Sequence, residues 1–427
     1  MADLRAFRGY RYDLGRVGAL GDVVAPPYDV IDASLQESLF ARSPHNVIRL
    51  ILEREGPDDN ESNNRYSRSG GVLRDWLRED VLVQDSARSL YVYEQEFEIE
   101  GRRLIRKGFM ARVRLEPFGS GRIFPHEQTL AAPKADRLKL LYATNMNLSP
   151  IFGLYPDSAG EVAAALEAAV GRSLPLEATD HLGVVHRLWP VSDQHAISVV
   201  SGLVSPQPIF IADGHHRYET ALRYLEERRE AGEVLDDESA PNFVLMHLVS
   251  MNDPGLVILP THRLIGGFPG LRAERLAEIL APHFDLERMS SAKDAWETIQ
   301  MDGGQSVLGF GTAADGVWQL ARLRNKAVMS KVAAGHSATW QDLAVAVLHA
   351  LVLDHLLRPA LGEPTCEYVH LLREVQDSTA PLAVLVPPAT IEHVAEIASG
   401  RETMPPKSTY FYPKLLSGLV FNPLRMT

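Results

Sequence analysis

The sequence predicts a mixed α/β fold of the α+β kind, built from more than one compact unit. Two alternating apolar runs around Glu100-Gly101 predict a β-hairpin over about 90–114. A short apolar run at 208–212 precedes a helical period over about 217–231, which predicts a strand followed by a helix. The chain has 427 residues, more than one core usually holds, so two or three units are expected.

Further elements follow from apolar periodicity along the chain. Apolar runs of period two, or short continuous ones, predict strands at 46–52, 151–155, 180–193, 243–251, 255–265, 306–312, 316–324 and 381–390. Helical periods are present at 70–80, 158–172, 271–284, 339–357 and 390–400. Because strands and helices are mixed throughout, an all-α or all-β class is excluded. A Gly/Pro-rich stretch at 266–270 marks a domain boundary, which gives domains at 1–265 and 266–427.

Composition and charge restrict the possible partners. Hydrophobic residues make up 45% of the chain and charged residues 23%, as in ordinary globular proteins. A net charge of −12 makes nucleic acid an unlikely partner and argues against an anionic membrane surface. The single cysteine, Cys366, excludes a disulfide framework and a multi-thiolate zinc site, and it fits a reducing cytoplasm. The longest apolar tract, 343–357, is too short for a membrane span, so we expect a cytoplasmic protein. Its oligomeric state is open.

The strand-to-helix junction at 213–217 concentrates polar chemistry. It consists of Asp213, Gly214, His215, His216 and Arg217. The first turn of a helix carries positive partial charge and unpaired N–H groups, so anions bind there. Gly214 lets the backbone approach a ligand closely, and Arg217 can grip phosphate oxygens. The junction therefore predicts a phosphate-binding turn; a plain turn capped by Asp213 is the alternative.

A second polar segment lies at 126–137. Glu127, beside His126, is a candidate general base for a hydroxyl proton. Lys134 and Arg137 could neutralise phosphate charge, and Asp136 could hold Mg²⁺. No second histidine follows at the HExxH spacing, which rejects a zinc protease. The alternative is a helix start with a solvated face.

Three shorter segments supply other pocket candidates. Tyr28 and Asp29 follow two prolines in a rigid loop, and His262 and Arg263 stand at a strand end. Lys407 lies in a Pro/Tyr-rich tail that lacks the glycines of a P-loop. Structural turns, and a tail that docks on a domain, are the alternatives.

Eight motifs together resemble a known family. They are "VVAPPYDVI", "PHEQT", "PKADRL", "SPIFGLY", "HRLW", "FIADGHHRYETAL", "LPTHR" and "MPPKSTYFYPKL". On these motifs the chain is identified as a member of the family called Domain of Unknown Function 1015. Its D-G-H-H-R junction is also similar to the phosphate-binding turn of the ParB/sulfiredoxin-like superfamily. That resemblance implies a ParB/sulfiredoxin-like core in 1–265, with a hairpin and helices inserted at about 50–200. A C-terminal α/β domain with a docking tail would follow at 266–427.

The superfamily resemblance implies a function for the junction. It implicates Gly214, His215, His216 and Arg217 in holding nucleotide phosphates. His215 stands where sulfiredoxin has its reactive cysteine, which argues against sulfinic-acid reduction. The negative charge argues against the DNA partitioning of ParB proteins, which leaves the branch of free-serine kinases.

We therefore expect a phosphotransfer enzyme that uses ATP or ADP with Mg²⁺ and acts on a small, serine-like hydroxylated metabolite. The expected catalytic residues are Glu127, His126, Asp213 and His215. A phosphoserine-type phosphohydrolase and a nucleotide-binding regulator without turnover are the alternatives.

Overall fold

A computed structural model describes residues 3–129 and 131–425 of the chain. The chain divides into two compact units. Unit 1 comprises Met1–Pro125, Thr129–Leu256 and Pro413–Thr427, and unit 2 comprises His126–Gln128 and Val257–Tyr412. Residues 257–265, grouped with the first domain from sequence, fall in unit 2, and the end of the chain falls in unit 1.

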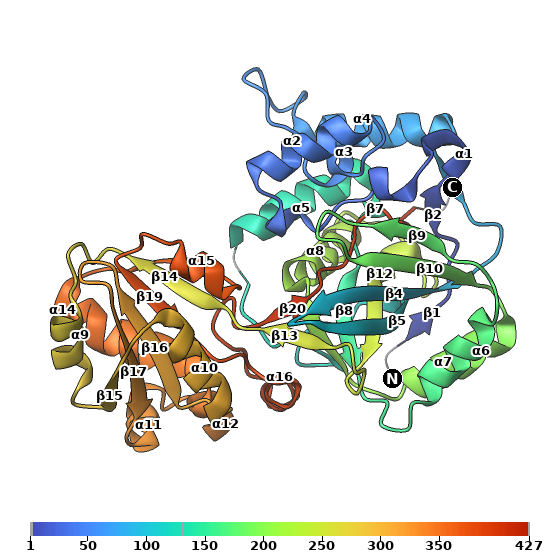
Figure 1. Ribbon diagram of the computed structural model, residues 1–427. Helices are drawn as coiled ribbons and strands as arrows, with labels where there is room; N and C mark the ends of the chain where they lie inside the picture. Colours follow the sequence, from blue (N-terminus) through green and yellow to red (C-terminus); the bar gives the residue numbers. More distant parts are fainter. Residues whose placement is uncertain (1–2, 130, 426–427) are drawn as a thin grey trace. The chain divides into compact units, whose positions relative to one another are not determined.

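A nine-stranded mixed sheet forms the centre of unit 1 (Figure 1). Its order is β6-β11-β8-β12-β5-β4-β10-β9, and β1 pairs with β5. The strands are β1 (Leu4–Arg5), β4 (Leu90–Ile99), β5 (Arg102–Arg114), β6 (Ile123–Phe124), β8 (Ile151–Tyr155), β9 (Leu176–Thr179), β10 (Val185–Val191), β11 (Ile209–Asp213) and β12 (Phe243–Ser250). Short pairs β2 (Tyr10–Tyr12) with β3 (Leu82–Gln84) and β7 (Met146–Asn147) with β21 (Asn422–Pro423) complete the unit.

The predicted hairpin is confirmed. β4 and β5 pair antiparallel, with Ile99 opposite Arg102. The two turn residues, Glu100 and Gly101, have φ values of 51° and 74°. This left-handed pair is the conformation of a two-residue hairpin turn that matches strand twist. The mixed α/β class expected from the sequence is likewise confirmed.

The α-helices of unit 1 are α1 (Leu14–Val17), α2 (Ala33–Arg42), α3 (Ile48–Ile51), α4 (Arg65–Arg78), α5 (Ala131–Thr144), α6 (Glu161–Val170), α7 (Gln194–Val204) and α8 (His215–Glu230). Short 3-10 turns lie at η1 (Leu20–Asp22), η2 (Tyr28–Val30) and η3 (Ala240–Asn242). The strand expected at 46–52 is wrong, because α3 occupies this position. Val47, Ile48, Leu50 and Ile51 are all buried, and this short run, interrupted only by Arg49, shows too little period to separate strand from helix.

The core of unit 1 lies between the sheet and helices α6, α7 and α8. Tyr218, Ala221 and Leu225 bury one face of α8 against Ile209 and Ile211 of β11. This packing fixes the direction in which α8 leaves the sheet. The polar turn between β11 and α8 is thus held on both sides by buried apolar contacts.

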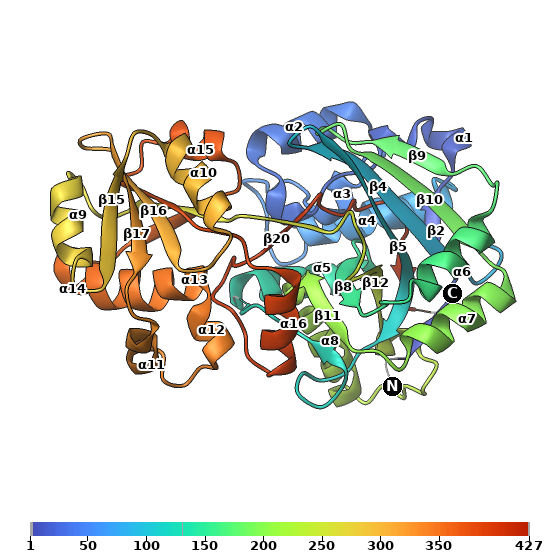
Figure 2. The same cartoon turned by 60° about the horizontal axis from the view of Figure 1, so that its bottom comes forward.

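Unit 2 contains a six-stranded sheet in the order β15-β17-β16-β19-β14-β18, and a separate pair β13-β20. The strands are β13 (Val257–Leu259), β14 (His262–Gly266), β15 (Phe284–Met289), β16 (Val307–Thr312), β17 (Val317–Leu323), β18 (Thr365–Val369), β19 (Leu382–Leu385) and β20 (Tyr410–Tyr412). Helices α9 (Ala273–Leu280), α10 (Ala292–Asp302), η4 (Lys326–Val328), α11 (Met329–Val332), α15 (Leu372–Gln376) and α16 (Ile391–Ser399) accompany them. Figure 2 shows α10 on one face of the sheet, and α13 (Ala344–Ala346) and α14 (Arg358–Leu361) on the other.

The long helix predicted at 339–357 is interrupted. α12 (Ala338–Asp342) ends at Leu343, and α13 (Ala344–Ala346) leads into a π-helix, η5 (Val347–Leu357), and α14 (Arg358–Leu361). The span Ala344–Leu361 is long and apolar enough to cross a membrane, so the expectation that it is too short is wrong. Half of the span is buried within the structure, and the core helix of a globular protein passes the same test. This single helix is therefore weak evidence for a membrane span.

Candidate functional site

The junction between β11 and α8 forms the turn that the sequence singled out. β11 ends at Asp213, and α8 begins at His215, two residues earlier than predicted. Gly214 is the N-cap, with φ of 93°, a conformation that favours glycine. The first helical hydrogen bond runs from Tyr218 N to Gly214 O at 3.0 Å. The N–H groups of residues 215–217 thus belong to the first turn and are directed out of the N-terminal end.

A local irregularity aims the turn. The pairing of β11 with β8 shifts register between Ile211 and Asp213. Such bulges bend a strand and redirect its side chains, and they are frequent beside functional sites. Asp213 consequently stands at the strand end, partly buried, with its side chain among positive charges.

Two cations face Asp213. Arg217 Nη2 lies 3.5 Å from Asp213 Oδ2, and Lys414 Nζ lies 3.4 Å from the same oxygen. The side chains of Arg217 and Lys414 are 13% and 12% exposed, so solvent screens them weakly. Arg217 also donates to the carbonyl of Pro150. Both cations thus lie beside the helix N-terminus, a position where an anion is favoured.

A buried arginine fixes the segment that carries Lys414. Arg106 of β5 donates to Gln95 Oε1 and, at 2.5 Å, to the carbonyl of Pro413. Gln95 in turn donates to the carbonyl of Lys414 at 2.9 Å. Burial lowers the pKa of Arg106 to about 10, while Asp213 among other groups opposes this shift. The predicted hairpin therefore positions Lys414. From the sequence, Lys414 was noted only as a lysine of the Pro/Tyr-rich tail, and Arg106 was not assigned, although an arginine on the inward period of a strand was a usable signal.

A small cavity of about 60 Å³ is lined by three predicted site residues that come from separate segments of the chain. It is lined by Tyr28, Arg137 and Arg217 together with Ile51, Leu140, Leu141, Thr144, Met146, Asn147, Leu148, Ser149, Ile151, Thr220 and Val244. The walls come from α5, α8 and the segment leading into β8. Cations at one side and apolar side chains elsewhere suit a small ligand with an anionic group. The sequence analysis did not single out Asn147 or Ser149.

Arg137 is held firmly at this cavity. Its guanidinium lies 4.0 Å from the centre of the Tyr28 ring, and Nη1 donates to the carbonyl of Ile51 at 2.8 Å. Burial, and then Asp29, raise the pKa of Tyr28, whereas Arg137 and Arg217 act in the opposite direction. Tyr28 is consequently protonated at neutral pH. Asp29 itself is exposed.

Lys134 and Asp136 lie on α5 with partners already in place. Lys134 Nζ is 2.7 Å from Glu219 Oε2, and Thr129 donates to Glu219 Oε1 at 2.8 Å. Asp136 Oδ1 accepts from Arg65 and Tyr66, at 2.5 and 2.7 Å.

Asp136 does not fit a metal ligand. Its Oδ2 accepts from Arg137 at 2.6 Å, so both carboxylate oxygens are occupied. Burial raises the pKa of Asp136, but Arg137 and Tyr66 outweigh it and the net shift is downward. Within residues 3–129 and 131–425, no group of three or more His, Cys, Asp or Glu side chains could hold a metal ion. We assign no Mg²⁺ to Asp136.

The remaining predicted residues belong to unit 2. Glu127 Oε1 accepts from Lys407 N at 2.6 Å. His126 is fully buried, and its Nε2 lies 2.8 Å from Thr409 Oγ1. His262 and Arg263 are buried on β14. Tyr28, Asp29, Lys134, Asp136, Arg137 and Asp213–Arg217 lie in unit 1, and His126, Glu127, His262, Arg263 and Lys407 lie in unit 2.

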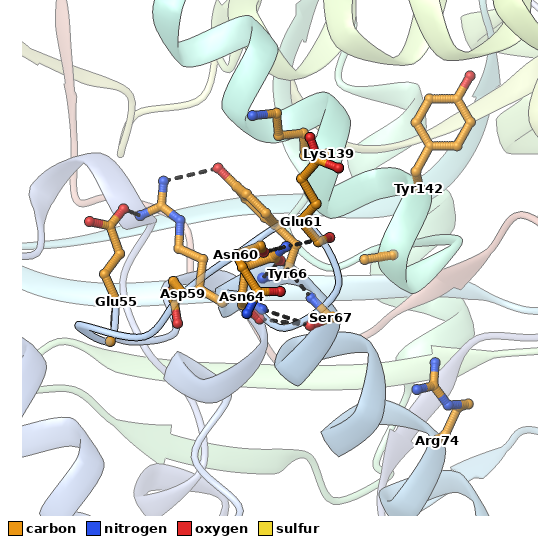
Figure 3. Close-up of a pocket in the computed structure, with 13 residues that line it drawn as sticks. Glu55, Asp59, Asn60, Glu61, Asn64, Tyr66, Ser67, Arg74, Lys139 and Tyr142 are labelled. Carbon is orange, nitrogen blue, oxygen red and sulfur yellow. Dashed lines mark hydrogen bonds and ion pairs between the residues drawn. The ribbon is translucent and has the colours of Figure 1, made fainter.

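A larger concavity of about 1010 Å³ lies over α4, α5 and the loop before α4 (Figure 3). Several of its charges pair within unit 1. Glu55 pairs with Arg65 at 3.0 Å, and Asp59 pairs with Arg68 at 2.6 Å. In Figure 3, Lys139 of α5 lies at the top of the view and Arg74 of α4 at the lower right. None of the predicted site residues lines it.

Comparison with known proteins identifies a family. The family model described as "Protein of unknown function (DUF1015)" matches residues 4–346. No curated protein matches the chain. Among solved structures, SbnI from Staphylococcus aureus has a TM-score of 0.36 at 12% identity, covering 74% of this chain and 87% of that one. A free serine kinase variant in complex with AMP gives 0.35 at 11%, with 68% and 84% covered. A conserved hypothetical protein from Pyrococcus furiosus gives 0.33 at 12%, with 69% and 89% covered.

Proposed function

The chain belongs to the DUF1015 family, as its motifs indicated, and since that family's description states no activity, we propose a function from the site. In this proposal unit 1 binds the phosphates of ATP or ADP at the turn Gly214–Arg217. The protein then transfers a phosphoryl group to a small, serine-like hydroxylated metabolite. A cytoplasmic location accompanies this proposal, because nucleotide and metabolite are both found there.

One observation carries the proposal: a positively charged helix N-terminus opens beside a small cavity. Arg217 belongs to the turn and also lines the cavity with Arg137 and Tyr28. A phosphate at the turn would take N–H donors from the first turn and charge-assisted bonds from Arg217 and Lys414. The cavity beside it could hold a group of a few heavy atoms, because about 60 Å³ exceeds the space of one water several-fold.

The chemical step follows from these groups. The substrate hydroxyl oxygen forms a bond to the γ-phosphorus of ATP, or the β-phosphorus of ADP, while the bond to the leaving phosphate oxygen breaks. The hydroxyl proton passes to a carboxylate, and Asp213 of the turn is the candidate base. Arg217, Lys414 and His216 would stabilise the charge on the transferred group and the leaving group. Asp213 can accept the proton once Arg217 and Lys414 bind the phosphates instead of its carboxylate.

A divalent cation, when bound with the nucleotide, neutralises phosphate charge. The occupied carboxylate of Asp136 does not fit that ion, so the cation in this proposal is brought by the nucleotide. The chain's own contribution is the orientation of phosphate by the turn and of the acceptor by the cavity. Lys134, paired with Glu219, is assigned to holding α5 beside α8.

The test is direct. Full-length protein is incubated with Mg²⁺ and ATP or ADP and a panel of hydroxylated metabolites that includes L-serine, and phosphate transfer is followed by ³¹P NMR. Parallel mixtures contain phosphoserine with and without ADP. Transfer that is lost in R217Q and kept in R223Q is expected. Phosphate release from phosphoserine alone would establish the hydrolase direction instead. Binding of nucleotide without any product would support a regulator and overturn the enzyme.

A further inference from the structure

Unit 2 contains buried polar atoms that lack hydrogen-bond partners within the described chain. They include Thr261 Oγ1, Arg263 Nε and His349 Nε2. Thr261 and Arg263 are 2% and 1% exposed. A buried donor or acceptor that makes no hydrogen bond costs about 1–3 kcal/mol, and more for a charged group. Such atoms are rare in folded proteins, and several at adjacent positions call for a physical reason.

Arg263 is the central member of this group. It lies on β14 directly opposite Tyr368 of the edge strand β18, and its guanidinium stands 5.4 Å from the Tyr368 ring centre. Its Nη1 donates to the carbonyl of Thr261, and its Nη2 donates to the carbonyl of Lys407 at 3.0 Å. No carboxylate forms an ion pair with it among residues 3–129 and 131–425. Burial lowers the pKa of Arg263, and the charges of Cys366, Tyr368 and Glu127 oppose that shift without cancelling it, so the buried charge is compensated only in part.

Thr261 lies directly beside Arg263. It precedes β14 (His262–Gly266), and its carbonyl accepts the hydrogen bond from Arg263 Nη1. Successive side chains of a strand point to opposite faces, so His262 lies on the face opposite Arg263, where its ring contacts Trp296 of α10 edge-on at 4.8 Å. Its Nδ1 accepts from Val386 N at 3.2 Å, and its Nε2 is a further buried atom that makes no hydrogen bond among the described residues.

His349 comes from an unusual element. It belongs to the π-helix Val347–Leu357, and π-helical segments are rare and frequent at functional sites. Burial, followed by the charge of Arg263, lowers the pKa of His349 to about 4. His349 is therefore neutral at pH 7, and its Nε2 makes no hydrogen bond among the described residues. Burial likewise lowers the pKa of Arg263 to about 10, which still leaves it charged.

We propose that Arg263, Thr261 and His349 form a binding site for the carboxylate group of a small ligand in unit 2. An arginine has more N–H donors than the two that bind carbonyls here, and the Nε–H of Arg263 is among the remainder. A carboxylate would accept from this N–H, and the hydroxyl of Thr261 and the imidazole of His349 complete its hydrogen bonds. A single buried cation balances one negative charge, so a carboxylate is favoured over a phosphate dianion.

The site lies close to an accessible loop. The carbonyl that covers Arg263 belongs to Lys407, which is exposed and has a left-handed φ of 58°. A non-glycine residue in this conformation is strained by about 1–3 kcal/mol. A ligand carboxylate could replace the Lys407 carbonyl as acceptor while this strain is relieved. The proposal uses residues of unit 2 alone and does not depend on the phosphotransfer proposed above.

The experiment uses the full-length protein and simple probes at constant ionic strength. Acetate and glycolate are titrated while the thermal midpoint is recorded, with acetamide as the uncharged analogue and inorganic phosphate as the alternative oxyanion. In protein labelled with ¹⁵N-arginine, the Nε–H signals report which arginine is contacted. We expect a saturable stabilisation by the two carboxylates, a shift of one arginine Nε–H signal, and no effect of acetamide.

Variants show which residues are responsible for the stabilisation by carboxylates. R263Q should abolish it, and R373Q, at an exposed arginine of unit 2, should leave it unchanged. T261V keeps the shape of Thr261 but removes the hydroxyl, and it should weaken acetate binding about five- to tenfold. If R263Q does not fold, T261V and the arginine signal decide. Equal effects of acetate and acetamide, tighter binding of phosphate, or no response to any probe would overturn the proposal. The last result would mean that buried water satisfies these atoms.

Discussion

Lys414 Nζ lies 3.4 Å from Asp213 Oδ2, and this ion pair joins the last segment of the chain to the turn at the start of α8. The pair places a second cation beside Arg217 in unit 1. Neither cation is exposed enough for its charge to be lost to solvent. The turn therefore combines a backbone geometry suited to anions with two side chains of the right charge.

Removing Arg217 should weaken nucleotide binding strongly. A charge-assisted hydrogen bond contributes about 1.5–3 kcal/mol, so R217Q is expected to raise the Kd for ATP or ADP roughly 10- to 100-fold. The control is R223Q on the same helix, where Arg223 pairs with Glu227 at 2.8 Å on the exposed side. Isothermal titration calorimetry measures both variants. Equal affinity in R217Q and the unmutated protein would remove the turn from the phosphate site.

A side chain at Gly214 should disturb the turn in two ways. Its φ of 93° strains any other residue by about 1 kcal/mol, and a Cβ there would stand 3.0 Å from the Arg217 guanidinium. G214A is therefore expected to lose both stability and nucleotide affinity. G232A provides the matched control, since Gly232 has φ of 82° and open space around the added atom. It should lose similar stability in urea unfolding and keep its affinity; a loss of affinity in both variants would contradict the contact argument.

Alanine at two adjacent glycines of α4 should change the free energy of unfolding in opposite directions. A Cβ at Gly70 would stand 2.6 Å from the carbonyl oxygen of Ala143, so G70A must separate α4 from α5 and should cost about 1–3 kcal/mol. A Cβ at Gly71 meets nothing closer than 3.8 Å, and alanine is the better helix former by up to about 1 kcal/mol. Urea unfolding of G70A and G71A compares them. A gain of stability in G70A would show that α4 and α5 do not approach so closely.

The pH dependence of stability should report His349. Its pKa is about 4 in the folded protein, against 6.5 for an unperturbed histidine. Between these two pH values, His349 is protonated in the unfolded chain and neutral in the folded protein. The free energy of unfolding therefore decreases as the pH falls from 6.5 towards 4. H349Q removes this contribution and should flatten the slope by up to about 1.4 kcal/mol per pH unit.

Unfolding by urea at a series of pH values between 4 and 7 measures that slope. H355Q, at an exposed position of the same π-helix, is the control and should keep the slope of the unmutated protein. An unchanged slope in H349Q would mean that His349 already titrates normally in the folded chain.

Local pattern predicted much of the secondary structure. The hairpin β4-β5 was readable because a two-residue turn that favours left-handed backbone joined two alternating runs. The helix α8 was readable because Tyr218, Ala221 and Leu225 repeat with its period. The helix α3 was not readable, because four buried apolar residues interrupted only by Arg49 are too short a run to show a helical or a strand period. The π-helix in 347–357 was also missed, since an apolar helical sequence does not indicate a change of helical type.

The candidate site divides in the same way. The sequence by itself determined the turn Asp213–Arg217, because a glycine between a strand and a helix and an arginine in the first turn are local features. Tertiary structure alone decided that Lys414 faces Asp213, that Arg106 supports it, and that Tyr28 and Arg137 line one cavity with Arg217. It also decided that the two carboxylate oxygens of Asp136 form ion pairs with Arg65 and Arg137. The physical reason is that charge partners and cavity walls come from segments far apart in the chain, and only the packing of the core brings them together.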